Sequence, residues 1–149
     1  MDEQLVIFNL AGESYGVGVG YVQSIMQMPP ITVVPGAASS IEGVINLRSA
    51  MVPVVDLRVR FELPPAPDGQ KKVAVVIELG GLAIAMIVDR VTDVTKVTAD
   101  LIELPSPLLS SGSNAFVRGL ARLGDRVIIL LDLDRIFDLD EYQVLKQAA

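Results

Sequence analysis

The chain has 149 residues, a formal net charge of −6 and an isoelectric point near 4.5, and 51% of its residues are apolar. An acidic chain lacks the basic surface that binds nucleic acid or anionic membranes, so we expect neither as a partner. It contains no His and no Cys, which excludes His or Cys metal sites and most nucleophilic hydrolase mechanisms. We therefore expect no metal, no cofactor and no catalysis.

Short runs of Val, Ile and Leu that end in Gly, Pro, Asn or Asp predict an all-β protein. The most apolar stretch, 73–91, is interrupted by Glu78 and Gly80-Gly81 before it reaches the roughly 20 residues of a membrane helix. The N-terminus is acidic, unlike a secretory signal, so we expect a cytoplasmic protein without membrane insertion. The predicted strands are 4–10, 15–19, 22–27, 41–47, 51–55, 72–79, 82–88, 91–97, 117–123 and 126–131.

The two halves of the chain repeat one plan. At a single offset Gly43 falls on Gly119 and Asp56 on Asp132, and most apolar positions in this stretch match as well. A proline-rich stretch at 64–70 separates the copies. The sequence predicts one domain over 1–149, with a first barrel copy at 1–63, a linker at 64–70, a second copy at 71–139 and a helical tail at 140–149. Copies this small are expected to pack against each other and to leave a groove where they meet.

The run IEGVINLRSAMVPVVDLRVRF, at 41–61, contains a polar interruption at a predicted hairpin tip. The stretch from Leu47 to Met51 crosses the predicted turn, so Arg48 and Ser49 fall at its tip. This place suits a guanidinium, which is costly to bury without a partner. The second copy has Gly124-Asp125 at the same place. Arg48 is thus either a solvated turn residue or a contact for another protein.

The same run resembles the signature of CheW-type coupling proteins, a Gly-Val-Ile-Asn-Leu-Arg-Gly hairpin followed by Val-Pro-Val-Val-Asp-Leu-Arg. The segments FNLAGESYGV, IVDRVTDV and RVIILLDLDRIF follow in the order of that family. The resemblance implies two pseudo-duplicated, SH3-like, five-stranded β-barrel subdomains with short helical turns and a C-terminal helix. It also implies a non-catalytic adaptor that joins the cytoplasmic tips of methyl-accepting chemotaxis receptors to the histidine kinase CheA, recruited to receptor arrays at the inner face of the membrane.

The resemblance places the partner-binding positions of the family on Val22, Gly43 and Arg48. The role of Gly43 is left open between a partner contact and a purely backbone requirement, because its counterpart in the second copy, Gly119, is also a glycine. Two departures from the family pattern are expected to face partners, since Ser24 replaces a usual Glu and Ser49 a usual Gly. Ser49 would cost on the order of 1 kcal/mol if its position keeps a left-handed conformation.

Two other functions remain open. A β protein that pairs one aspartate from each half, Asp56 and Asp132, would resemble an aspartic protease. Neither aspartate is followed by the Thr-Gly or Ser-Gly of that family, and helix capping at 57–61 and 133–137 explains both. A small-ligand β-barrel is the second alternative, although aromatic residues for its pocket are few.

Overall fold

The computed structural model describes residues 2–35, 41–103 and 116–136, and within them the chain is mostly strands. The helical elements are α1 (Leu57–Arg60), α2 (Leu133–Ile136) and the 3-10 turns η1 (Val19–Tyr21) and η2 (Ala99–Leu101). None of these is long and apolar enough to cross a membrane. The strands are β1 (Asp2–Leu10), β2 (Glu13–Gly18), β3 (Val22–Gln27), β4 (Ile41–Leu47), β5 (Ala50–Asp56), β6 (Val73–Leu79), β7 (Leu82–Val88), β8 (Arg90–Thr98), β9 (Ile102–Glu103), β10 (Val117–Leu123) and β11 (Arg126–Leu131).

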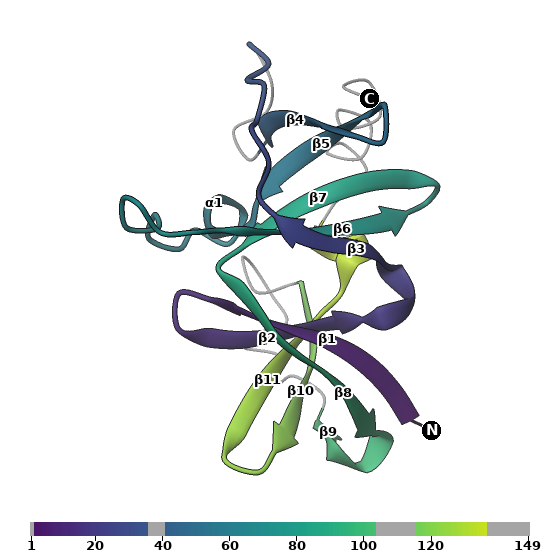
Figure 1. The fold of residues 1–149 in the computed structure, drawn as a ribbon. Coiled ribbons are helices and arrows are strands. Elements are labelled where there is room, and N and C mark those ends of the chain that lie inside the picture. Colours follow the sequence, from purple (N-terminus) through teal and green to yellow (C-terminus); the bar gives the residue numbers. More distant parts are fainter. Residues whose placement is uncertain (1, 36–40, 104–115, 137–149) are drawn as a thin grey trace.

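The strands form two sheets. The five-stranded sheet has the order β3-β6-β7-β5-β4, and the six-stranded sheet has the order β8-β1-β2-β11-β10-β9. Figure 1 shows the five-stranded sheet above the six-stranded sheet, with β8 running from one to the other. The predicted all-β fold is confirmed, and each predicted strand is present. β9 was not predicted and gives the second sheet its sixth strand, while the predicted tail at 140–149 lies outside the described residues.

The sheets do not follow the division of the sequence into halves. β1 and β2 join β8, β9, β10 and β11, whereas β6 and β7 join β3, β4 and β5. The prediction that 1–63 form one barrel and 71–139 the other is therefore wrong in its assignment of strands. Asp89 alone separates β7 from β8, and a hairpin needs about two residues to reverse the chain. β8 therefore continues away from β7 and enters the other sheet.

The duplication is nevertheless preserved in the pairing register. Ser24 of β3 pairs with Val76 of β6. Asp93, the counterpart of Ser24 in the second copy, pairs with Ile7 of β1. The two parallel contacts, β5–β7 and β11–β2, match in the same way: Val54 with Ala85, and Leu130 with Gly16. The two copies thus share one topology and have exchanged their first hairpins.

The exchanged hairpins, β1–β2 and β6–β7, are buried on both faces. Val6 and Phe8 of β1 lie in a large core to which both sheets contribute, while Leu5 and Ile7 lie in the core of the six-stranded sheet. β6 and β7 alternate between the large core and the core of the five-stranded sheet. Alternate residues of a strand face opposite sides, so burial on both sides explains the nearly continuous apolar runs.

Candidate functional site

The β4–β5 hairpin ends in a turn formed by Arg48 and Ser49, as the sequence predicts. Leu47 pairs with Ala50 across the turn, and φ is 51° for Arg48 and 68° for Ser49. Ser49 thus adopts the left-handed conformation that a glycine would take without strain, at a cost of about 1 kcal/mol. Arg48 is exposed, and its guanidinium makes no hydrogen bond or ion pair with any residue that the structure describes.

A hollow of about 460 Å³ opens beside this turn, and we call it the hairpin hollow. It brings Ser24 and Arg48 together, although they lie on β3 and at the end of β4. Among the described residues that line it, the one charged group is the Arg48 guanidinium, which can bind a carboxylate. Its lining residues are Gln23, Ser24, Leu47, Arg48, Ala50, Val52 and Ala83.

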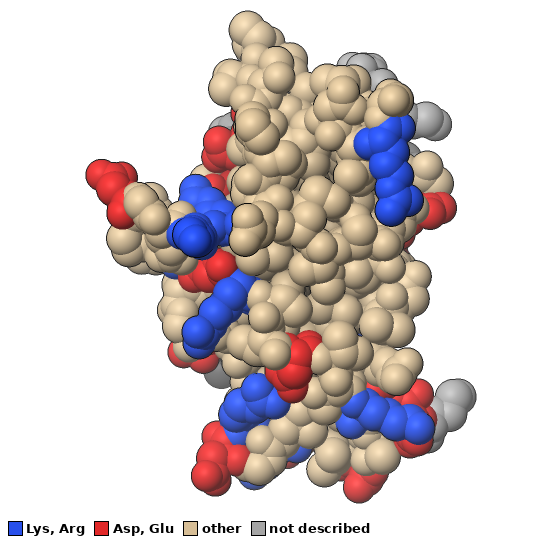
Figure 2. Space-filling model, in the orientation of Figure 1, with Lys and Arg blue, Asp and Glu red and all other residues tan. Residues whose placement is uncertain are grey.

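The matching place in the six-stranded sheet carries an ion pair. Asp93 stands where the first copy has Ser24, and Arg126 stands where it has Ala50. Their side chains meet at 3.4 Å between Nη2 of Arg126 and Oδ2 of Asp93. Hydrogen bonds from Thr95, at 2.6 Å, and from Thr92 lower the pKa of Asp93. Figure 2 shows the same contrast at larger scale, because charged side chains gather over the six-stranded sheet and are sparse over the middle of the five-stranded sheet.

Gly43 and Val22 lie outside the hairpin hollow. Gly43 has a φ of 152°, and a Cβ there would lie 2.1 Å from the carbonyl oxygen of Thr32. Thr32 approaches so closely because its N–H and C=O exchange hydrogen bonds of 2.9 Å with Val44. In the same manner, the absence of a side chain at Gly119 allows the backbone of Glu103 in β9 to pack closely against β10. Gly43 therefore meets a backbone requirement, and Val22 is half-buried against the large core.

The aspartates of both copies cap the short helices, as predicted. Oδ1 of Asp56 accepts a hydrogen bond from the backbone N–H of Arg58 at 2.9 Å. Oδ1 of Asp132 accepts one from the N–H of Asp134 at 3.1 Å. Each carboxylate thus serves its own helix N-terminus, and the protease dyad has no support in this geometry.

An ion pair between the buried Arg58 and the half-buried Asp89, at the junction of the sheets, was not predicted. Arg58 of α1 donates from Nε and Nη2 to the two oxygens of Asp89, at 3.0 and 2.6 Å, and from Nη1 to the carbonyl of Pro64. The N–H of Ala11 also donates to Asp89. Burial alone would raise the pKa of Asp89, but the hydrogen bonds from Arg58, Ala11 and Gln70 outweigh it and lower that pKa. The sequence offered a signal, because Arg58 interrupts an apolar run where the second copy has Asp134.

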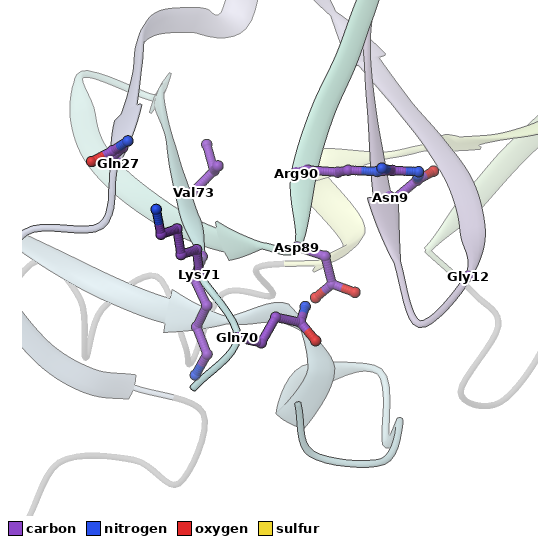
Figure 3. A pocket seen from close by; sticks show the side chains of 9 residues that line it. Asn9, Gly12, Gln27, Gln70, Lys71, Val73, Asp89 and Arg90 are labelled. Carbon is purple, nitrogen blue, oxygen red and sulfur yellow. The ribbon is translucent and has the colours of Figure 1, made fainter. Parts of the chain in front are cut away.

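Asp89 also lines a second hollow, of about 580 Å³, which we call the junction hollow. Figure 3 shows Asn9 and Arg90 on one side of it, Gln27 and Lys71 on the other, and Asp89 with Gln70 between them. The sequence predicts a groove where the copies meet, and this hollow lies at the crossing from β7 to β8. Its lining residues are Asn9, Gly12, Gln27, Gln70, Lys71, Lys72, Val73, Asp89 and Arg90.

Known proteins with similar sequences and with a similar fold are chemotaxis proteins. The chemotaxis protein CheW of Klebsiella aerogenes is 30% identical over 99% of this chain and 89% of its own length. That of Bacillus subtilis is 28% identical over 95% of this chain and 90% of its own. The crystal structure of the scaffolding protein TtCheW from Thermoanaerobacter tengcongensis aligns with a TM-score of 0.85 and 33% identity, over 95% of this chain and 96% of that one.

The family model of the CheW-like domain matches residues 4–141. This match includes every described helix and strand except the first residues of β1. With the relatives above, it confirms both the predicted fold and the predicted role of a chemotaxis adaptor. The chain belongs to the CheW-like domain family.

Proposed function

We propose that this chain is a non-catalytic adaptor that couples the cytoplasmic tips of methyl-accepting chemotaxis receptors to a CheA-type histidine kinase. It would work in the cytoplasm, at receptor arrays on the inner face of the membrane. The observation that carries the proposal is Arg48, an exposed guanidinium that has no partner among the described residues and lies on a strained turn beside an open hollow. The name of the Thermoanaerobacter relative, a scaffolding protein, supports the same class of function.

Arg48 is assigned the recognition of a carboxylate on one of these partners. A guanidinium binds a carboxylate through two parallel hydrogen bonds, which fixes orientation as well as affinity. Apolar walls formed by Val52 and Ala83 reduce access of water to such a pair. Ser24 leaves the space that an acidic side chain would otherwise occupy, so the partner supplies the carboxylate.

The other predicted partner positions act on the same site through the backbone. Gly43 lets the segment around Thr32 lie against β4, which carries the hairpin tip. Val22 anchors β3, and β3 supplies Ser24. Both are positioning residues in this proposal, and Ser49 holds Arg48 in place through the turn.

Coupling in this proposal is geometric. The two sheets share one large core, so partners bound at different places on the surface keep a fixed relative position. A receptor state that favours one arrangement of the bound kinase then biases kinase activity through differences in binding free energy. No chemical step by the adaptor is needed.

The test is kinase autophosphorylation in a reconstituted mixture of receptor, CheA and adaptor. Wild type is expected to make kinase activity depend on the receptor, and Arg48→Gln to weaken partner binding at least about fivefold, as expected for loss of a partly exposed ion pair. Arg122→Gln is the matched control, because Arg122 lies beside the corresponding hairpin tip and pairs within the chain with Glu103.

If Arg48→Gln and Arg122→Gln support the same receptor-dependent kinase activity, Arg48 does not contact a partner. A wild-type protein that binds neither receptor nor kinase would overturn the adaptor assignment for this chain, and a search for small-molecule ligands would then be justified.

A further inference from the structure

Most basic side chains in the described part of the chain have a partner. Carboxylates pair with Arg58, Lys96, Arg118, Arg122, Arg126 and Arg135. Arg60 donates to the carbonyl of Ile136, and Arg90 donates to the side-chain oxygen of Asn9 when that amide takes the orientation that satisfies both groups. Within the described residues, the cations that remain without a partner are Arg48, Lys71 and Lys72. Arg48 lines the hairpin hollow, and both lysines line the junction hollow.

The carboxylate in the junction hollow does not compensate these lysines. Asp89 is held by two nitrogens of Arg58 and by the N–H of Ala11. Its side chain is only 14% exposed, and its negative charge is already neutralised by Arg58, on the side away from the hollow. The lysines, with Arg90 on the opposite side, leave this hollow locally positive in a chain whose net charge is −6.

The shape of the site favours an extended occupant. A smaller hollow of about 190 Å³ adjoins the junction hollow and is lined by Gln27, Met28, Lys71 and Lys72. Since Gln27 and both lysines belong to both hollows, a bound chain would pass the two ammonium groups in succession.

The remaining lining groups suit a peptide. The side-chain amide of Gln27 offers a donor and an acceptor of the kind that bind peptide backbone, whereas the amides of Asn9 and Gln70 already bond to Ser14 and Asp89. Val73 adds an apolar contact. Compact phosphate sites instead gather backbone N–H groups or arginine forks around one anion.

We propose that the junction hollow binds an extended acidic segment of a partner protein, whose Asp or Glu carboxylates pair with Lys71 and Lys72. The proposal goes beyond the adaptor function assigned above, because it depends neither on Arg48 nor on the hairpin hollow. Affinity is modest at a partly exposed site and falls as salt concentration rises.

The test is an NMR titration of the ¹⁵N-labelled full chain with short synthetic peptides. The probe is an acetylated hexapeptide of alternating Glu and Ala, and its control is the same peptide with Gln for Glu. The acidic peptide is expected to shift the amide resonances of 70–73 and 9–12, and the Gln peptide is not. Lys71→Gln/Lys72→Gln is expected to raise the dissociation constant about fivefold or more, whereas Lys96→Gln, at an exposed lysine outside the hollow, is expected to leave it unchanged.

Two results would overturn the proposal. In one, the double lysine variant binds the acidic peptide as wild type does, while its thermal unfolding is also unchanged. In the other, inorganic phosphate or the Gln peptide saturates the same resonances at the same concentration, which identifies a simple anion site or a backbone site. Neither result bears on Arg48, so this proposal and the adaptor proposal fail separately.

Discussion

The two hairpin tips of the duplicated fold occupy matching places and use them differently. In the six-stranded sheet, Arg126 and Asp93 form an ion pair beside the β10–β11 tip. In the five-stranded sheet, Ala50 and Ser24 stand at those positions beside a hollow, and Arg48 at its rim has no partner in the described part of the chain. One backbone plan thus either satisfies its polar site internally or leaves it for another protein. The choice depends on a few side chains and not on the fold.

The largest expected effect concerns the junction, where the copies also differ. Arg58→Met leaves the half-buried Asp89 carboxylate without its cation and without two of its hydrogen bonds, which is expected to lower the free energy of unfolding by about 3 kcal/mol. Asp134→Ala, at the exposed counterpart of Arg58, is expected to change it by less than about 0.5 kcal/mol. Urea denaturation of both variants at pH 7 measures the contrast.

The pH dependence of the Arg58→Met effect identifies its cause. The pKa of Asp89 is lowered in the folded protein, so the stabilisation is complete above the unfolded value of about 3.9 and is lost as pH falls through the lower, folded value. The gap between wild type and Arg58→Met is therefore expected to narrow below about pH 4. A gap that stays constant from pH 7 to pH 3 would assign the loss to packing instead.

The next prediction compares Gly43 with Gly119, the glycines at matching positions of the two copies. Gly43→Ala places a Cβ against the carbonyl of Thr32 at a φ of 152°, and it is expected to cost about 3 kcal/mol through strain and overpacking. Gly119→Ala meets its nearest atom at 3.0 Å, and no positive φ is involved, so about 1 kcal/mol is expected. Equal losses in thermal or urea unfolding would show that the two positions do not differ as described.

Transplanting the ion pair tests whether the hollow matters. Ser24→Asp combined with Ala50→Arg copies the pair Asp93–Arg126 into the first copy. Stability is expected to change by less than about 1 kcal/mol, as for other exposed pairs, while receptor-dependent kinase activation is lost. If activation persists in the folded variant, the open hollow is not the contact and the comparison has no functional meaning.

The smallest expected effect lies in the turn itself. Ser49→Gly removes left-handed strain at a φ of 68° but adds freedom to the unfolded chain, so a net gain of about 0.5 kcal/mol is expected. Asp125→Gly serves as the control, because Asp125 has no positive φ, and it is expected to give no gain. Melting temperatures measured side by side distinguish the two.

Local features of this molecule were predictable from the sequence, and the exchange of hairpins was not. The turn at Arg48 and the cap at Asp56 follow from short-range chemistry within a few residues. The nearly continuous apolar run of β1 would look the same whether β8 or β3 lay beside it, so the pattern does not identify the pairing. β9 was also not predictable, because a strand of two residues is too short to show an apolar pattern.

The sites depended on contacts that no local pattern contains. The hairpin hollow exists because Ser24 and Ala50 are both small, and their proximity appears only once β3 and β5 are placed in one sheet. Arg58 was visible as an asymmetry between the copies, as Arg48 was. Its partner Asp89, however, lies at a bend whose position depends on the exchange.

The exchange also has a consequence for synthesis and folding. When the ribosome has released only the first half, β1–β2 lacks β8 and β11, and β3 and β5 lack β6–β7. The free edges of the β1–β2 and β4–β5 hairpins, and the whole of β3, therefore stay unpaired until the second half emerges, and folding is then limited by contacts between distant parts of the chain. A chain cut within 64–70 would give two fragments that each lack strands of both sheets, and each fragment would serve as the template on which the other folds.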